Sequence, residues 1–333
     1  MSPFFTRGLG EQMLKIDQVF QAKKDIEPFI IKTPLVFSRS LSRITESSVY
    51  LKLENRQPTG SFKVRGAVNK LIVLSQSETQ QRLVAASAGN HALGVAYAAK
   101  KLGYHNLAIF VPQNCPPAKL DKLRHYPIDL RQEGNSYDEA VEAAREYQKK
   151  RGGIWISAYD DLDIITGQAT IGLEIMSDLP EADVVIVPVG GGGLISGVAS
   201  ALQALKPGIE VVGIQPSASP SALMSLRDNK AYDPYEHEPT MADGLAGGFG
   251  KLPLKLAYNL VDQILLASEA EIGQAVVRLF EDEQIIAEPS GAISIAPLLN
   301  GEMDLDGRTA VCIISGGNLS VDVFRKIIDS KLR

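Results

Sequence analysis

Residues that bind transition metals or form disulfides are scarce in this sequence. It has two cysteines, Cys115 and Cys312, and four histidines among 333 residues. Neither a Cys-x-x-Cys nor a His-x-x-His pair occurs, so the sequence predicts neither a disulfide framework nor a transition-metal site. Cys312 lies in an apolar run, and we expect it to be buried and unreactive. A chain of this kind is typical of the reducing cytosol.

Long apolar runs and an excess of basic charge are also missing. No stretch reaches the roughly 20 apolar residues of a membrane-spanning helix, and the first residues lack the charged and apolar regions of a secretory signal. The formal net charge of −5 offers no basic surface to a nucleic acid. We therefore expect a cytoplasmic protein that binds neither membranes nor nucleic acids. The length and the ordinary composition, with 45% apolar residues, allow two packed lobes.

What the sequence does contain is an alternation of short apolar runs with amphipathic segments. This pattern is typical of an α/β protein with mostly parallel sheets, and unbroken apolar runs are typical of strands covered on both faces. The predicted strands are 49–53, 83–86, 107–111, 128–131, 154–157, 184–189, 211–214, 263–267 and 310–314. The predicted helices are 62–74, 91–102, 137–150, 166–178, 194–205, 269–283, 290–299 and 321–332. The glycine- and proline-rich stretch 232–250 predicts a long loop of the kind that often forms a pocket wall.

Four consecutive glycines follow the apolar run 184–189, and a helix is predicted to begin directly after them. They are Gly190, Gly191, Gly192 and Gly193, which we call the tetraglycine loop. Without side chains the backbone amides can close on an anion, and the N-terminus of the helix adds partial positive charge. A mere flexible turn is the weaker interpretation, because so much glycine is entropically costly. The tetraglycine loop therefore predicts a phosphate site.

The pattern does not match the phosphate sites of dinucleotides or nucleoside triphosphates. The G-x-G-x-x-G register is broken, since Ile195 stands five residues after Gly190, and the strand after the helix ends in Gln215 rather than an acidic residue. No Lys-Ser or Lys-Thr pair follows, as a P-loop requires. The phosphate of pyridoxal 5'-phosphate (PLP) fits this loop better.

A lysine, Lys63, lies in the run Ser-Phe-Lys-Val-Arg-Gly-Ala at 61–67. PLP enzymes hold their cofactor through a Schiff base to a lysine, and they tune the ring through the group that faces its pyridine nitrogen. A lysine early in a helix is usually a surface residue, so its assignment depends on the other segments. We predict that Lys63 holds the cofactor and that the ring of Phe62 packs beside it.

Two further loops place polar side chains between a predicted strand and a predicted helix. Ser315 ends an apolar strand, and its hydroxyl could reach the pyridine nitrogen without charging it, which favours β-elimination. Asn90 could donate a hydrogen bond to the ring oxygen of PLP. Ser87, His91 and the amides that open the helix could hold a substrate carboxylate. Capping of the following helix is the competing interpretation for both loops.

Together these segments resemble the threonine/serine dehydratase family, which includes serine racemase and belongs to the fold type II PLP enzymes. The resemblance rests on the run at 61–67, Ser-Ala-Gly-Asn-His at 87–91, the tetraglycine loop, Ala-Asp-Gly at 242–244, Glu-Pro-Ser-Gly-Ala at 288–292 and Ser-Gly-Gly-Asn at 315–318. The matches come in the order of the family and extend from about residue 33 to the end of the chain.

The resemblance implies two open, mostly parallel twisted sheets flanked by helices in two domains. Residues 1–81 and 159–333 would form a large PLP-binding domain, and residues 82–158 a small, mobile substrate-side domain. It also implies a homodimer or homotetramer, with Lys63 as the catalytic residue and Glu288 near the far edge of the ring. The implied cofactor-binding residues are Phe62, Lys63, Asn90, Gly190, Gly191, Gly192, Gly193, Leu194 and Ser315, and the implied substrate-binding residues are Ser87, Asn90 and His91.

Several positions depart from the family pattern. Ala88 stands where serine racemase has a serine that exchanges protons on the face opposite the lysine, so elimination is favoured over racemisation. Gln215 and Ser221 stand where racemase-like members hold a divalent cation with carboxylates, so we expect no divalent metal, while a monovalent ion stays open. Tyr159 replaces an asparagine of the racemase. No regulatory domain of the biosynthetic threonine dehydratases is expected after the catalytic unit.

The sequence thus predicts a PLP-dependent dehydratase, or ammonia-lyase, acting on a β-hydroxy α-amino acid. L-Threonine or L-serine is the default substrate, and the products are a 2-oxo acid and ammonia. The alternatives are an amino-acid racemase and a lyase for hydroxyaspartate or phenylserine, the latter suggested by the glycines of 244–250. A β-replacement synthase, expected to carry a Thr-Ser-Gly-Asn-Thr type of loop at 87–91, and a non-catalytic PLP carrier are further alternatives.

Overall fold

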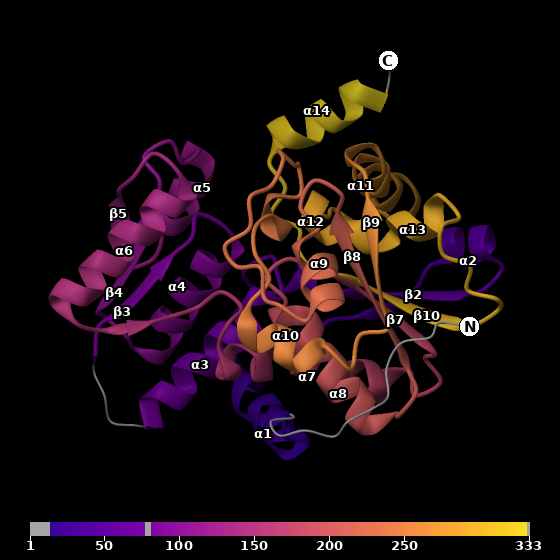
Figure 1. Cartoon of the computed structure of the whole chain (residues 1–333), viewed down its shortest axis with the longest axis horizontal. Coiled ribbons are helices and arrows are strands. Elements are labelled where there is room, and N and C mark those ends of the chain that lie inside the picture. The colour runs from indigo at the N-terminus through magenta and orange to yellow at the C-terminus, as the bar shows by residue number, and fades with distance from the viewer. Residues whose placement is uncertain (1–13, 77–80, 332–333) are drawn as a thin grey trace.

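The computed structural model describes residues 14–76 and 81–331. These residues form two β-sheets with helices packed on them, and Figure 1 shows the two sheets side by side. The α/β class and the mostly parallel sheets that the sequence predicts are confirmed. In the same part of the chain, no helix combines the length and the apolarity needed to cross a membrane.

The larger sheet has six strands in the order β1-β2-β10-β7-β8-β9. They are β1 (Leu35–Phe37), β2 (Ser48–Leu53), β7 (Val184–Pro188), β8 (Glu210–Pro216), β9 (Gln263–Ala267) and β10 (Thr309–Ile314). β1 is antiparallel to β2, whereas the other neighbours are parallel. Because β7 and β10 are parallel neighbours, the tetraglycine loop and Ser315 follow them at the same edge of the sheet.

Both faces of the larger sheet are buried, as its unbroken apolar strands predict. In β7, Val184 and Ile186 enter the core on one face, and Val185 and Val187 enter the core on the other. The first core is completed by α2 (Arg39–Thr45), α11 (Glu269–Glu283) and α13 (Ala296–Leu299). The second is completed by α7 (Leu162–Asp178), α8 (Gly193–Leu205) and α10 (Lys251–Ala257).

The second sheet has four parallel strands in the order β5-β4-β3-β6. They are β3 (Leu83–Ala86), β4 (Leu107–Val111), β5 (Asp129–Gln132) and β6 (Ile154–Trp155). One face packs on α3 (Lys63–Gln76), α4 (Asn90–Leu102) and α5 (Pro117–Arg124), and α6 (Tyr137–Arg151) covers the other. All four strands fall within residues 82–158, while the division of the chain into two domains stays a prediction.

Most elements agree with the pattern of the sequence, and β1 is the strand that it missed. The pattern also missed the short helices α2, α5, α10 and α9 (Ser221–Asp228), and the N-terminal α1 (Ile16–Ile26). The predicted loop 232–250 is confirmed, apart from a 3-10 turn at Asp243–Leu245. The predicted helix 321–332 corresponds to α14 (Val321–Lys331). Its last residue, like the residues on which the signal-peptide prediction rests, lies outside the described part of the chain.

One predicted helix, 290–299, is wrong as a single element. The structure has α12 (Pro289–Ala292), a 3-10 turn (Ile293–Ile295) and α13 in succession. Pro297 lies at the start of α13, and it has no amide hydrogen to donate to the preceding turn. A continuous α-helix through this position would lose that hydrogen bond, so the segment breaks into short pieces.

Candidate active site

The loop before Lys63 pairs with the loop after β10, which brings two distant segments together. The amide of Phe62 donates to the carbonyl oxygen of Ser315 at 3.0 Å, and the amide of Gly317 donates to that of Gly60 at 2.8 Å. Between these two bonds, Ser61 and Gly316 form an isolated β-bridge. The reactive end of α3 is therefore fixed by backbone bonds beside Ser315.

The side-chain amine of Lys63 lies in a largely desolvated place. It donates to the carbonyl oxygen of Ala158 at 2.8 Å, and it is 5.2 Å from the centroid of the Phe62 ring. Burial lowers its pKa from the usual 10.5 to about 8, because the charged form loses its hydration. A larger fraction of the amine is therefore neutral near physiological pH, as a nucleophile or base requires.

A buried charge network lies directly behind Lys63, and sequence reasoning missed it. Arg65 is fully buried and donates two bonds to each of the carboxylates of Glu54 and Glu174, at 2.7 to 2.9 Å. Lys52 donates to Glu174 at 2.6 Å. Burial alone would raise the pKa of Glu54, but the charges of Arg65 and Lys52 and the bonds from Arg65 and Thr33 together hold that pKa below its usual value. Two cations and two anions thus clamp the first turn of α3.

The tetraglycine loop connects β7 to α8 and has room only for glycine. A side chain at Gly190 would come within 2.9 Å of the Leu245 Cα, and one at Gly191 would collide with the ring of Tyr159. Gly192 has a φ of +92° and is the N-cap of α8, with no side chain capping that helix. The free amides at this end can hold an anion such as a phosphate.

Asn90 is the first residue of α4, and both ends of its amide are engaged. Its nitrogen donates to Oε1 of Glu288 at 2.5 Å, and its oxygen accepts from Nδ2 of Asn318 at 2.7 Å. The helix has no side-chain cap at its N-terminus, so the competing capping interpretation fails for this loop. The amides that open α4 are available to an anion.

His91 is buried beside these groups, but it carries no positive charge. Burial and, to a smaller extent, the nearby charge of Lys63 lower its pKa from 6.5 to about 3, against the opposing effect of a bond to Ile156. Its Nε2 is 3.0 Å from the carbonyl oxygen of Ile156, so that nitrogen must hold the proton and Nδ1 is left as an acceptor. Ser87 accepts from the amide of Gly89 at 3.1 Å. The predicted carboxylate site stays a prediction, and any such site would depend on α4 and Ser87 rather than on a cationic histidine.

Ser315 and Glu288 lie on neighbouring loops, since the amide of Glu288 donates to the carbonyl oxygen of Gly316 at 3.1 Å. The hydroxyl of Ser315 donates to the carbonyl oxygen of Ser290 at 3.3 Å, a long bond that a ligand could replace. Burial raises the pKa of Glu288 to about 7, against the opposing effect of the bond from Asn90. Glu288 is therefore close to half-ionised at neutral pH.

Tyr159 covers the tetraglycine loop and ties it to the long loop 232–250. Its hydroxyl lies 2.9 and 3.1 Å from the two carboxylate oxygens of Asp233. Burial raises the pKa of Tyr159, and the charge of Asp233 adds to the shift. Burial also raises the pKa of Asp233, against the bond from Tyr159. Tyr159, at which the sequence departs from the family pattern, thus forms a wall of the site.

These surroundings fit pyridoxal phosphate. The cofactor brings a phosphate, a ring nitrogen and a ring oxygen, and the site offers the amides of the tetraglycine loop, a hydroxyl and a side-chain amide. Buried hydroxyls of Thr59, Ser61 and Ser196 have no hydrogen-bond partner. The first two lie just before Lys63 and the third lies in the first turn of α8. Unpaired buried polar groups are costly, and a bound polar ligand would offer them partners.

Gln215, at which the sequence predicts no divalent cation, uses its amide within the protein. The oxygen of Gln215 accepts from the backbone amides of Ala222 and Leu223 at 3.0 and 3.2 Å, and its nitrogen is 3.4 Å from the hydroxyl of Ser221. Gln215 thus caps the start of α9. In the described ranges no group of three or more metal-ligating side chains occurs, and the absence of a divalent metal stays a prediction.

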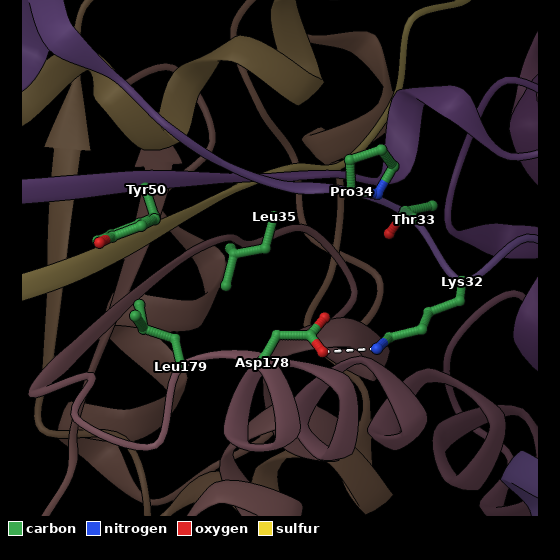
Figure 2. A pocket seen from close by; sticks show the side chains of 7 residues that line it. All are labelled: Lys32, Thr33, Pro34, Leu35, Tyr50, Asp178 and Leu179. Atoms are coloured by element: carbon green, nitrogen blue, oxygen red, sulfur yellow. Dashed lines mark hydrogen bonds and ion pairs between the residues drawn. The ribbon is translucent and has the colours of Figure 1, made fainter.

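A separate cavity of about 300 Å³ lies between β1, β2 and the end of α7. Figure 2 shows Lys32 and Asp178 pointing at one another across it, 2.5 Å apart, beside Leu35, Tyr50 and Leu179. None of the predicted site residues lines it. The charged groups of the cavity neutralise each other, so the candidate site remains the edge where Lys63, the tetraglycine loop and Asn90 meet.

Comparisons with known proteins agree with this geometry. The sequence model of the family described as pyridoxal-phosphate dependent enzyme matches residues 26–316. An L-threonine ammonia-lyase of Thermotoga maritima is 42% identical over 321 residues, which make up 96% of this chain and 79% of that protein.

Solved structures resemble the whole chain. Threonine deaminase isoform 2 of Solanum lycopersicum superposes with a TM-score of 0.87 at 32% identity, covering 95% of this chain and 89% of that one. Maize serine racemase superposes with a TM-score of 0.87 at 29% identity, covering 96% and 98%.

Proposed function

The chain belongs to the family of pyridoxal-phosphate dependent enzymes, and from that premise we propose that it is a dehydratase, or ammonia-lyase, for β-hydroxy α-amino acids. L-Threonine is the first substrate to test, because the relative from Thermotoga maritima is named an L-threonine ammonia-lyase. The products would be a 2-oxo acid and ammonia. The observation that carries the proposal is the partly neutral amine of Lys63, which donates to Ala158 next to Tyr159, the residue that covers the tetraglycine loop.

Lys63 has two roles in this proposal. Pyridoxal phosphate, when bound, supplies an aldehyde for covalent attachment and a conjugated ring that withdraws electron density from the substrate. Lys63 would hold it, and the amine of Lys63 would take the proton from the α-carbon of the substrate. A pKa near 8 leaves this amine able both to accept and to return a proton at neutral pH.

The other residues would bind and orient. The amides of the tetraglycine loop and of Leu194 would hold the phosphate, and Phe62 would pack beside the ring. Asn90 would donate to the ring oxygen, and Ser315 would donate to the pyridine nitrogen while leaving it uncharged. The amides that open α4, together with Ser87, would hold the substrate carboxylate, and neutral His91 would support this loop through Ile156.

Elimination is favoured over racemisation by a side chain that has no proton to exchange. Racemisation needs an acid or base on each face of the α-carbon, whereas elimination needs only Lys63 on one face. Ala88, within the predicted carboxylate loop, has only a methyl group. Serine racemase of maize shares the fold, so formation of a D-amino acid is the alternative that the experiment must measure.

The long loop 232–250 supports a preference for substrates with small, uncharged β-substituents. A side chain at Gly248 would collide with Asp233, and one at Gly250 would come within 3.0 Å of both Tyr159 and Pro253. Gly248 and Gly250 therefore make room for protein side chains, whereas a side chain at Gly247 would meet nothing within 4 Å. The carboxylate of Asp233 would also repel an acidic substituent. We therefore rank threonine and serine above hydroxyaspartate and phenylserine.

The wider organisation is part of the proposal. Residues 1–81 and 159–333 would form a large domain and residues 82–158 a small mobile one, which is supported by the separate sheet formed by β3, β4, β5 and β6. We propose a homodimer or homotetramer located in the cytoplasm, with no membrane or nucleic-acid partner.

The test measures 2-oxo acid formation by the purified holoprotein over a panel of L-threonine, L-serine, 3-hydroxyaspartate and phenylserine. Lys63→Ala should abolish turnover, and Lys150→Ala, which removes an exposed lysine of α6, should not change it. Chiral chromatography of the serine reaction would detect D-serine. Racemisation without 2-oxo acid formation, or an unchanged rate in Lys63→Ala, would refute the proposal.

A further inference from the structure

A chain of hydrogen bonds joins the two sheets through four side chains, those of Glu288, Asn90, Asn318 and Lys122. The nitrogen of Asn90 donates to Glu288 at 2.5 Å, and Asn318 donates to the oxygen of Asn90 at 2.7 Å. Lys122 of α5 donates to the oxygen of Asn318 at 2.9 Å. Asn90 and Lys122 lie on helices that pack against the second sheet, whereas Glu288 and Asn318 lie in loops of the larger one. The chain therefore joins the two sheets at the candidate site.

The side-chain amides of Asn318 and Asn90 are oriented by neighbouring groups that can only accept or only donate a hydrogen bond. The carbonyl oxygen of Thr59 can only accept, and it lies 2.8 Å from Nδ2 of Asn318. The ammonium of Lys122 can only donate, so it requires the oxygen of Asn318 on the other side. The second hydrogen of Asn318 then faces Asn90, which must present its oxygen. This leaves the nitrogen of Asn90 facing Glu288, with one hydrogen free.

We infer that Asn318 is a positioning residue that fixes the amide of Asn90 so that its free N–H can donate to the ring oxygen of the cofactor. The inference rests on the proposed function, in which Asn90 faces that oxygen. With the amide reversed, Asn90 would present an oxygen to Glu288 and to the ring oxygen, and both contacts would lose their donor. Because Lys122 belongs to α5, contact between the sheets and the orientation of Asn90 are coupled.

Two glycines leave the space that these side chains occupy. Gly60 has a φ of +74°, and a side chain there would come within 2.9 Å of the amide of Asn318. A side chain at Gly316 would collide with Glu288 and come within 3.3 Å of Nδ2 of Asn90. Gly60 and Gly316 therefore leave the room that the side chains of Asn318, Glu288 and Asn90 need.

Glu288 makes the arrangement sensitive to pH. Burial and the charge of Asp243 raise its pKa, the bond from Asn90 and the charges of Lys119 and Lys122 lower it, and the result is about 7. Ionised Glu288 accepts the hydrogen of Asn90 more strongly than the protonated form does. Titration of this carboxyl should therefore change how strongly Asn90 polarises the ring oxygen.

The first test removes the donor of Asn318, which serves both Thr59 and Asn90, without changing the shape of the side chain. Asn318→Asp replaces the donating nitrogen with an oxygen, and we expect the dissociation constant of the cofactor to rise about tenfold. The visible absorption band of the bound cofactor should also shift at constant pH. Asn300→Asp is the matched control, because Nδ2 of Asn300 also donates to a side-chain oxygen, that of Glu271 at 2.5 Å, but on the surface. It should change neither quantity.

The second test removes the titrating group. The spectrum of the bound cofactor in the unmodified protein should change with a midpoint near pH 7, and Glu288→Gln, which keeps an acceptor for Asn90, should abolish that transition. Wild-type affinity and spectrum in Asn318→Asp, or the same titration in Glu288→Gln, would overturn the inference.

Lys122→Ala keeps the inference testable should Asn318→Asp fail to fold, because Lys122 is exposed. We expect its cofactor affinity to fall about threefold, and unchanged affinity and spectrum would refute the coupling between the sheets. Absence of turnover in a holoprotein with the expected spectral changes would instead refute the proposed function and leave this inference standing.

Discussion

The amine of Lys63 points at the main-chain carbonyl oxygen of Ala158, 2.8 Å away. The residues around Ala158 lie between β6 of one sheet and α7 of the other. Within this crossover, the carbonyl of Ile156 fixes His91, and the ring of Tyr159 covers the tetraglycine loop. A single short segment therefore contacts the amine of Lys63, the imidazole of His91 and the tetraglycine loop. The site is built where the chain passes from one sheet to the other.

The lowered pKa of Lys63 predicts how cofactor binding depends on pH. Only the neutral amine attacks an aldehyde, and with a pKa of about 8 roughly one tenth of it is neutral at pH 7. The association rate of pyridoxal phosphate with the apoprotein should therefore rise about tenfold towards a plateau above pH 9. Stopped-flow absorbance would measure it, with Lys63→Ala giving no visible band. A midpoint near 10.5 would mean that burial does not act on this amine.

The tetraglycine loop and Lys63 could be proposed as site residues from the sequence because their signals are local. Gly190 to Gly193 stand between an apolar strand and a helix, and this order alone predicts an anion site. The assignment of Lys63 to the cofactor is supported by its neighbours in the run 61–67. The charge network behind it gave no such signal, because Arg65 and Glu174 are 109 positions apart. Nothing near either residue distinguishes it from an ordinary surface charge.

The orientation of the polar groups was equally hidden. The sequence assigned His91 to a carboxylate, but its neutral state follows from burial and from the carbonyl of Ile156, 65 positions away. Asn318 was treated as part of a motif, and its bond to Asn90 depends on two loops that meet only in the fold. Pattern reasoning finds residue types at strand ends, whereas pairing and charge state depend on tertiary contacts.

Gly191→Ala should damage the cofactor site through Tyr159. The new methyl group would collide with the tyrosine ring, so either the ring or the loop must move. We expect cofactor affinity to fall at least about tenfold, equivalent to about 1.4 kcal/mol. Equilibrium dialysis would measure it. Gly273→Ala is the control, since its nearest neighbour would be 3.7 Å away. Adding Tyr159→Ala to Gly191→Ala should restore part of the affinity, and no rescue would mean that the collision is not the cause.

Glu288→Gln should change the pH dependence of stability in the apoprotein. The pKa of Glu288 is raised from 4.5 to about 7, so its ionisation favours the unfolded chain. Glu288 should not affect the free energy of unfolding below pH 4.5. As pH rises through 7, its ionisation should lower that free energy by about 2 kcal/mol, after allowance for partial exposure. Urea unfolding at pH 5 and pH 8 should show that the free energy of unfolding of the variant, relative to that of the unmodified protein, is clearly higher at pH 8 than at pH 5. An equal difference at both values would contradict the raised pKa.

Glu174→Gln should be among the most destabilising conservative changes in the described chain. The carboxylate of Glu174 is paired with Lys52 and Arg65, and all three side chains are at most 2% exposed. Its loss would leave a buried positive charge uncompensated, at a cost of about 3–5 kcal/mol. Urea unfolding would measure the change, with Glu146→Gln as the control, because Glu146 pairs with Lys150 at the surface and its substitution should leave the free energy of unfolding nearly unchanged.

A second substitution separates charge imbalance from a merely lost contact. Lys52→Met added to Glu174→Gln removes one cation and restores the balance of the cluster, so it should recover part of the stability even though it deletes two further hydrogen bonds. It would also allow measurement if the single variant proved insoluble. If the double variant were less stable than Glu174→Gln alone, individual contacts rather than net buried charge would control this network. In that case the clamp behind Lys63 would be a set of independent bonds.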